Sequence, residues 1–266
     1  MSIKRSPAQL LFESWFTLGT NPPFHQVPKS MYLSTTLTQV QAQQLHSALG
    51  TEVTEYYYKS ILSLIEAIEA LREDLYSWTT VKLYYSAYYS TKAYLLLYDY
   101  AILRAERRLY YIKARPGEAF VKCTNTTDHK AAFELLCKFF PGDYLLSNTV
   151  DSISAYDWIM SKREEVNYRD ISFHEPNPPE FWETINHELC SASVLELIDR
   201  LVHDASGLYC FQADYAILGV PLKRLELTVS SMKAIGLFTP LSEDRRNYIS
   251  NLLTNYPISL TTSIMI

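Results

Sequence analysis

Glycine is scarce in this chain, with 7 copies among 266 residues, whereas average usage is about 7%. Because glycine supplies the backbone freedom that tight turns need, its scarcity favours long helices joined by few loops. The two glycine-rich phosphate-binding patterns, G-x-G-x-x-G and G-x-x-x-x-G-K-[ST], do not occur in the sequence. The sequence therefore excludes a dinucleotide-binding or P-loop enzyme.

Cysteine is also sparse, and no two cysteines have the C-x-x-C spacing of redox and zinc motifs. His187 and Cys190 are three residues apart on a predicted helix, but with His203 and Cys210 they match no common zinc module. Cys190 is better explained as a small apolar residue. We therefore expect reduced thiols, no metal site and no cofactor. The four cysteines are Cys123, Cys137, Cys190 and Cys210.

Long hydrophobic runs are missing as well. The longest apolar stretch, residues 93–103, is interrupted by Asp99 and is shorter than the roughly 20 residues that a membrane span needs. The first residues lack the apolar run of a secretory signal. These observations predict a cytoplasmic protein that makes no contact with a membrane. The net charge of −5 has the wrong sign for non-specific binding to nucleic acid, although a local basic patch is compatible with it.

The hydrophobic residues, 48% of the chain, recur mainly at the three- and four-residue spacing of helices. The first predicted helix buries Leu11, Trp15 and Leu18, the second ends at Gly50, and Pro221 occupies the first turn of another. We expect the tail, residues 256–266, to form a strand or to dock on a partner. The predicted helices cover residues 7–18, 36–49, 51–71, 75–103, 129–140, 150–168, 181–202, 221–235 and 243–253.

Basic and aromatic residues alternate between residues 104 and 115, where the helical spacing stops. Residues 109–112 and 119–121 flank an Arg-Pro-Gly-Glu sequence, which predicts a β-hairpin with a Pro-Gly turn. Alternating cations and rings suit single-stranded RNA, because phosphates meet the charges and bases stack on the rings. The alternative is a solvated ribbon whose tyrosines pack on the helices. The residues concerned are Arg104, Arg107, Arg108, Tyr110, Tyr111, Lys113 and Arg115.

The segment from Arg163 to Pro176 closes one predicted helix and enters a proline-rich loop. Within it, Arg169-Asp170 is followed after three residues by His174. Upstream lies VKLYYSAYYSTKAYLLL, which is apolar almost all round, as expected of a helix buried in a bundle. With these two features the sequence resembles the HEPN superfamily, whose nucleases carry an arginine, four to six residues and a histidine after the third core helix.

The resemblance covers residues 51–203. It implies a mostly α fold, an antiparallel bundle of four or five HEPN-like helices, with residues 106–124 as an inserted β-hairpin. Residues 1–50 form a helical extension before the bundle. Residues 204–266 form a second extension that ends in the apolar tail.

The resemblance also implies a metal-independent endoribonuclease that acts in a bacterial phage-defence or toxin–antitoxin system. His174 would move a proton of the ribose 2′-hydroxyl or the leaving oxygen, and Arg169 would stabilise the phosphate charge. Asp170 would orient the arginine. The products would carry a 2′,3′-cyclic phosphate and a 5′-hydroxyl. Family members pair two such motifs across a dimer, so a homodimer is expected.

An alternative gives Arg169 and His174 structural roles. An arginine near a helix C-terminus often caps carbonyl groups, and His174 is then an ordinary loop residue. The protein would be a non-catalytic interaction subunit that binds a protein partner of a multi-component defence system. The acidic pI, the apolar tail and the flanks outside the resemblance favour this alternative.

Overall fold

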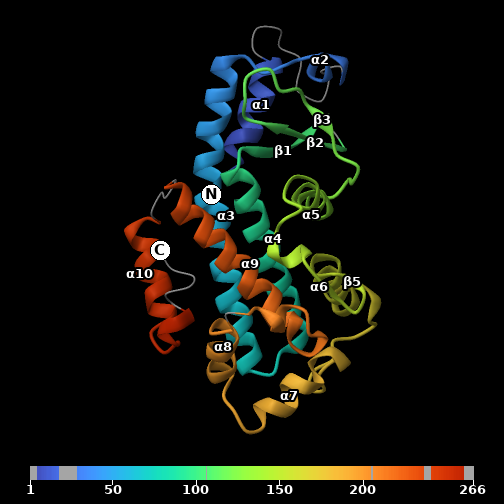
Figure 1. Ribbon diagram of the computed structural model, residues 1–266, viewed down its shortest axis with the longest axis vertical. Helices are drawn as coiled ribbons and strands as arrows, with labels where there is room; N and C mark the ends of the chain where they lie inside the picture. The colour runs from blue at the N-terminus through green and yellow to red at the C-terminus, as the bar shows by residue number, and fades with distance from the viewer. Residues whose placement is uncertain (1–4, 18–28, 106, 205, 237–240, 261–266) are drawn as a thin grey trace. The chain divides into compact units, whose positions relative to one another are not determined.

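The computed structural model describes residues 5–17, 29–105, 107–204, 206–236 and 241–260 (Figure 1). In these residues the fold is mostly α, as expected, with one three-stranded and one two-stranded antiparallel sheet. The chain divides into two compact units: Met1–Tyr56 with Thr91–Phe139 forms unit 1, and Tyr57–Ser90 with Phe140–Ile266 forms unit 2. Within the described residues, no helix has both the length and the apolar character that crossing a membrane requires.

Most of the elements are helices, and the strands fall in the middle of the chain. The α-helices are α1 Pro7–Thr17, α2 Lys29–Leu33, α3 Gln39–Arg72, α4 Tyr76–Leu97, α5 Asp128–Phe139, α6 Ala155–Glu164, α7 Glu183–Leu189, α8 Val194–Val202, α9 Ala213–Ile235 and α10 Glu243–Leu252. The strands are β1 Tyr100–Ala105, β2 Arg108–Lys113, β3 Val121–Lys122, β4 Thr149–Val150 and β5 Ile153–Ser154. Shorter helical turns are Tyr144–Leu146, Glu165–Arg169, Glu180–Trp182 and Leu208–Cys210.

Unit 1 packs α1 and α5 against the β1-β2-β3 sheet (Figure 1). The buried side of α1 is Ala8, Phe12 and Phe16, not the predicted face of Leu11 and Trp15; Leu18 lies outside the described residues. The reason is aromatic packing, because the rings of Phe12 and Phe16 contact those of Tyr32 and Phe120 at centroid distances of 5.0–6.1 Å.

The predicted helix over residues 75–103 is too long, because α4 ends at Leu97 and β1 begins at Tyr100. Asp99 has a φ of 70°, a left-handed conformation that ends a helix. Its carbonyl accepts a hydrogen bond from the Ala114 N–H at 2.9 Å. The chain therefore turns at Asp99 and continues as the edge strand β1.

The predicted hairpin is confirmed in part. β2 pairs antiparallel with β3, with Tyr110 opposite Lys122, and the Arg-Pro-Gly-Glu sequence lies between these strands. The longer pairing joins β2 to β1 over six residues, from Tyr100 opposite Lys113 to Ala105 opposite Arg108. The sheet therefore has one strand more than predicted, β1. Residues 100–103 of this strand fall in the predicted helix over residues 75–103, because the apolar run of that helix continues into them.

Gly50 lies inside α3, so the two helices predicted on either side of it are one. Leu45, Leu49, Val53 and Tyr57 follow each other at four-residue spacing and are all buried. Their shared apolar face continues through the glycine and offsets its cost in a helix, about 1 kcal/mol relative to alanine.

Unit 2 packs α6, α7 and α8 around α9 (Figure 1). Pro221 lies inside α9 instead of starting it, because the preceding turns of α9 are buried apolar residues whose burial outweighs the roughly 3 kcal/mol that an interior proline costs. The predicted helix over residues 181–202 is two helices, because Ser193 begins α8 with a capping box to Glu196.

Two further boundaries differ from prediction. The helix expected over residues 150–168 begins at Ala155, after the strands β4 and β5, and ends in a π-helical turn. In the expected C-terminal strand, residues 258–260 are helical and residues 261–266 lie outside the described part of the chain. The boundaries are set by local capping: Ser154, for example, caps the first turn of α6, so the helix starts there and not at residue 150.

Candidate functional site

Arg169 ends the π-helical turn Glu165–Arg169, directly after α6. The turn closes with a hydrogen bond from the Asp170 N–H to the Glu165 carbonyl. Arg169 is 65% exposed, and its Nη2 lies 3.4 Å from Oε2 of Glu164. Its guanidinium is therefore presented at the surface, held by one exposed ion pair of the kind that contributes little to stability.

His174 and Asp170 form a close pair. Nε2 of His174 lies 2.5 Å from Oδ2 of Asp170, and the side chains are 33% and 29% exposed. Asp170 therefore positions the histidine and not the arginine, in contrast to the expected role. A histidine oriented by a carboxylate and still accessible from solvent has the arrangement of a general acid–base group.

Glu175 fixes the loop to the beginning of α4. Its two carboxylate oxygens accept hydrogen bonds from the N–H and the hydroxyl of Ser77, at 2.7 and 2.9 Å. The Ser77 hydroxyl in turn accepts a hydrogen bond from the N–H of His174 at 3.3 Å. A carboxylate at a helix N-terminus satisfies an otherwise unpaired N–H and is favoured by the helix dipole. Ser77 and Glu175 thus hold His174 in place, and sequence reasoning missed both.

Arg163 attaches the end of α6 to α4 through aromatic contacts. Its guanidinium lies 4.6 Å from the centre of the Tyr168 ring and 5.3 Å from that of Tyr84. It also donates a hydrogen bond to the Tyr168 hydroxyl at 2.9 Å and one to the Tyr85 hydroxyl at 3.4 Å. Burial raises the pKa of Tyr84 well above its usual range, so the ring is neutral. Arg163 is therefore part of the support of the loop.

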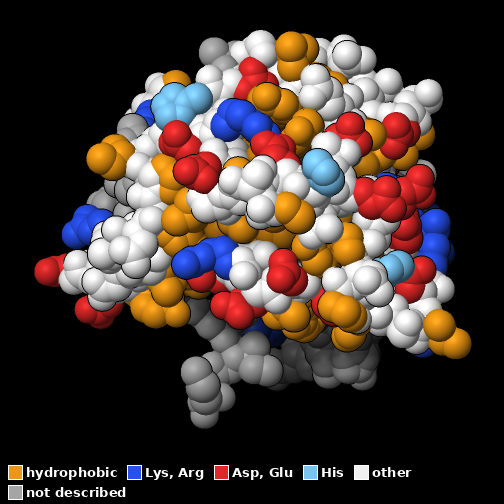
Figure 2. Space-filling model, turned by 90° about the horizontal axis from the view of Figure 1, so that it is seen from below, with side chains coloured by type: hydrophobic (Ala, Val, Ile, Leu, Met, Phe, Trp, Pro, Cys, Tyr) orange, Lys and Arg blue, Asp and Glu red, His pale blue; other side chains and the backbone are white. Residues whose placement is uncertain are grey.

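Hydrophobic side chains are exposed around the same loop. Figure 2 views the molecule from below Figure 1 and shows hydrophobic side chains at the surface between charged ones. Trp78 and Phe173 pack against each other and line one cavity with Leu75, and exposed apolar surface of this kind marks sites of binding. We call the following residues the apolar patch: Leu75, Trp78, Tyr168, Ile171 and Phe173, which are 40–105% exposed.

The arginines of the predicted RNA-binding hairpin are on the surface of unit 1. Arg107, Arg108 and Arg115 are exposed. Arg104 is exposed too, and its guanidinium lies 3.5 Å from Asp128. The cationic half of the predicted RNA-binding surface is therefore accessible.

The tyrosines of the hairpin are not accessible. Tyr110 is 2% exposed and packs against Tyr32, and Tyr111 is 9% exposed and packs against Phe139. Lys113 is half-buried, with its ammonium 4.6 Å from the centre of the Tyr100 ring. Bases cannot stack on buried rings, so the structure favours the alternative in which the tyrosines pack on the protein.

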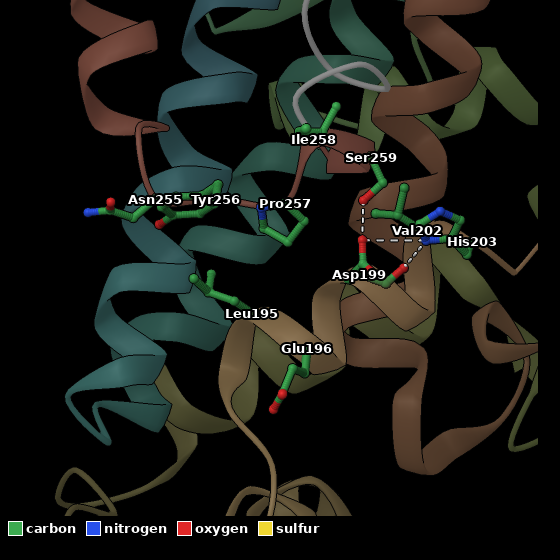
Figure 3. Close-up of a pocket in the computed structure, with 10 residues that line it drawn as sticks. All are labelled: Leu195, Glu196, Asp199, Val202, His203, Asn255, Tyr256, Pro257, Ile258 and Ser259. Carbon is green, nitrogen blue, oxygen red and sulfur yellow. Dashed lines mark hydrogen bonds and ion pairs between the residues drawn. The ribbon is translucent and has the colours of Figure 1, made fainter.

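A cavity of about 890 Å³ lies between α8 and residues 255–259 (Figure 3). Asp199 accepts a hydrogen bond from the Ser259 hydroxyl, and its Oδ1 lies 3.4 Å from Nδ1 of His203. The carboxylate thus stands between serine and histidine. In a serine nucleophile site the histidine must contact the serine hydroxyl, so this trio does not form one. In the described residues, no group of three or more His, Cys, Asp or Glu side chains could hold a metal ion.

Unit 2 contains a buried ion pair that sequence reasoning also missed. Nη1 of Arg224 lies 2.5 Å from Oδ2 of Asp143, and the side chains are 0% and 3% exposed. The Tyr156 hydroxyl donates to Asp143 at 3.0 Å and accepts from Arg224 at 3.2 Å. Burial would lower the pKa of Arg224, but Tyr156 and Asp143 outweigh it and raise that pKa. The arginine is therefore permanently charged, and the network links α9, α6 and the turn Tyr144–Leu146.

No protein-family model, no curated protein and no solved structure matches this chain. The HEPN resemblance, and the division of the chain at residues 50 and 203 that accompanies it, therefore stay predictions.

Proposed function

We propose that this protein is a metal-independent endoribonuclease whose catalytic groups are His174 and Arg169. The observation that carries the proposal is the contact of 2.5 Å between His174 and Asp170 in a solvent-accessible loop. The exposed guanidinium of Arg169 belongs to the residue next to Asp170 in the chain. The phosphate-binding cation and the carboxylate that positions the acid–base group thus start from adjoining backbone positions.

The reaction is an internal transesterification of RNA. The ribose 2′-oxygen loses its proton and forms a bond to phosphorus, while the bond from phosphorus to the 5′-oxygen breaks and that oxygen gains a proton. His174 accepts the first proton or delivers the second, and Arg169 stabilises the negative charge on the non-bridging oxygens. The products are a 2′,3′-cyclic phosphate and a 5′-hydroxyl. Asp170 acts as a positioning residue through its contact with Nε2 of the histidine.

The carboxylates near the loop would repel RNA if they were uncompensated. Asp170 contacts His174, Glu164 contacts Arg169, and Glu175 accepts two hydrogen bonds at the N-terminus of α4. Glu164 therefore has a cation beside it and Glu175 a helix dipole, which reduces the repulsion of a phosphate, while Asp170 is engaged by the histidine ring.

The apolar patch favours a second function, that of an interaction subunit. Tyr168, Ile171 and Phe173 expose 66%, 105% and 64% of their surface. Such surface is typical of sites that bind another protein. In this function His174 and Arg169 are part of the contact surface, and the partner is a protein of the same defence system.

RNA cleavage in the presence of EDTA separates the two functions. We expect the wild-type protein to cut single-stranded RNA and leave cyclic-phosphate ends. His174→Ala and Arg169→Ala should each lower kcat by a factor on the order of 10²–10⁴, the range of general acid–base and oxyanion-stabilising groups. Rates are measured with end-labelled RNA, and product ends by their resistance to a phosphatase.

Two exposed residues of unit 2 serve as matched controls. His187→Ala and Arg246→Ala remove the same side-chain types from the surface and should leave the rate unchanged. Circular dichroism establishes that all variants are folded. Cleavage that proceeds equally in the His174→Ala protein would contradict the assignment, and purified wild type that cuts no RNA would leave the interaction function as the better explanation.

A further inference from the structure

Trp78 and Phe173 form a cleft beside His174. Their ring centres are 6.5 Å apart, and the ring planes are inclined by 34°. Together with Leu75, Ser77 and Glu175 they line a cavity of about 190 Å³. We call this cavity the aromatic cleft. Two of its lining residues are aromatic, and two others, Ser77 and Glu175, form the contact that anchors the loop.

The spacing of the rings points to a flat occupant. Stacked bases are separated by about 3.4 Å, so a base between two parallel rings needs them about 7 Å apart. The observed 6.5 Å between the ring centres, with planes inclined by 34°, is close to this separation and lies within the range of aromatic pairs, about 4.5–7 Å. Trp78 and Phe173 are 52% and 64% exposed, so both rings retain free surface. A cavity of this volume equals about six waters in the liquid, which suits a flat heteroaromatic ring.

The position of the cleft adds a second argument. Phe173 directly precedes His174, and Trp78 directly follows Ser77, whose hydroxyl accepts a hydrogen bond from the His174 N–H. A group held between the rings therefore lies next to the backbone of the proposed acid–base residue. The exposed cation of Arg169 belongs to the same segment. One RNA strand can therefore place a base in the cleft and a phosphate beside Arg169.

We propose that the aromatic cleft binds an unstacked nucleobase next to the cleaved phosphate, which makes the substrate a single-stranded or looped RNA. The inference rests on the proposed function, because His174 defines which phosphate is cut. Base stacking on aromatic side chains tolerates any sequence. The cleft therefore selects unpaired RNA over duplex RNA, whose bases are already stacked.

Binding of a non-cleavable RNA tests the cleft separately from catalysis. The probe is a short single-stranded RNA with 2′-O-methyl riboses, measured by fluorescence anisotropy. Trp78→Leu and Phe173→Leu should weaken binding about 5- to 100-fold, the range for the loss of one stacked base. Trp78→Phe keeps a ring and should retain most of the affinity. Tyr248→Leu removes an aromatic ring of similar exposure, 53%, from α10 and should have no effect.

A ribose-phosphate strand without bases is the second probe. Wild type, Trp78→Leu and Phe173→Leu should bind it equally, because it offers nothing to stack. Equal binding of the base-containing probe by all three proteins, or no binding by wild type, overturns the inference. So does a change from dimer to monomer in Trp78→Leu without loss of RNA affinity, which identifies the rings as a protein interface.

The two proposals fail in different ways. Ring-dependent binding by a wild-type protein that cuts no RNA removes the catalytic assignment and leaves the cleft in place. Cleavage that needs His174 while binding is independent of Trp78 and Phe173 removes the cleft and leaves the catalytic assignment.

Discussion

Arg224 carries a permanent charge in a position with no exposed surface. The energetic cost of removing such a charge from water is repaid only when its partners are complete. Here Asp143, Tyr156 and Thr228 all contact the guanidinium. Three elements of unit 2 meet at this side chain: α9, α6 and the turn Tyr144–Leu146. A shift of any one of them would break hydrogen bonds of Arg224, so the network fixes their relative positions.

We predict that Arg224→Met lowers the free energy of unfolding by about 3–5 kcal/mol, because it leaves the carboxylate of Asp143 buried without a countercharge. The double variant Arg224→Met/Asp143→Asn removes both charges and should recover part of this loss. Urea denaturation followed by circular dichroism measures both effects. A loss below about 1 kcal/mol in the single variant, the size of an exposed ion pair, would show that the pair is not buried in solution.

At the same scale, part of the candidate site was predictable. Arg169, Asp170 and His174 lie within six residues, so one sequence segment contains them. Glu175 and Ser77 are 98 positions apart, and no local pattern connects a loop glutamate to a distant helix start. The hairpin tyrosines were misjudged for a related reason: alternation with arginines is visible in sequence, whereas packing of Tyr110 against Tyr32 is not.

At the scale of the elements, α3 and α9 each contain a glycine, and the two glycines differ in how much space surrounds them. A Cβ added at Gly50 of α3 would have no neighbour within 4 Å. A Cβ added at Gly219 of α9 would lie 2.9 Å from the Tyr209 carbonyl oxygen and 3.0 Å from the Cys210 nitrogen. The turn Leu208–Cys210 therefore approaches α9 as closely as the missing side chain permits.

We predict opposite effects of the same substitution at these two glycines. Gly50→Ala should raise the free energy of unfolding by about 0.5–1 kcal/mol, because alanine is the better residue inside a helix. Gly219→Ala should lower it by about 1–3 kcal/mol, because the backbone of the turn must move away. Urea midpoints of the two variants and wild type provide the comparison. If Gly50→Ala lowered the free energy of unfolding instead, α3 would not be continuous at residue 50, and the prediction that a helix ends there would be supported.

The presence of a helix was easier to predict from the sequence than its first and last residues. Apolar residues at three- and four-residue spacing indicated α1, α5 and α10 with bounds close to those observed. The limits failed where strand pairing or burial decides: β1 is a strand because it pairs with β2, and α9 runs through Pro221 because its surroundings are apolar. The three- and four-residue spacing of apolar residues indicates neither the pairing nor the burial.

For the whole molecule, both compact units are discontinuous in sequence. Unit 2 consists of residues 57–90 and residues 140–266. Inside it, Ser60 hydrogen-bonds to Ser86 and to Ser90, and the Ser90 carbonyl accepts a hydrogen bond from Thr228 of α9. Its core is thus shared between α3, α4 and the helices that follow residue 140.

We predict that residues 140–266 expressed alone do not fold cooperatively. The fragment keeps α6 to α10 but lacks the apolar side chains that residues 57–90 contribute to the core, so its hydrophobic gain falls short of the entropy cost of ordering. Thermal unfolding by calorimetry is the measurement, with the full chain as control. A single sharp transition in the fragment would show that the second unit is independent of α3 and α4.

The discontinuous units also fix an order of events during translation. Residues 57–90 leave the ribosome before either unit can form, and unit 1 has all of its residues once Phe139 has been made. The segment 57–90 belongs to unit 2 and must then wait for α9, more than 70 residues later. At about 5–20 residues per second, its apolar faces stay without their native partners for several seconds. We expect the nascent chain to be most prone to aggregation during this interval, because the apolar surface is then exposed.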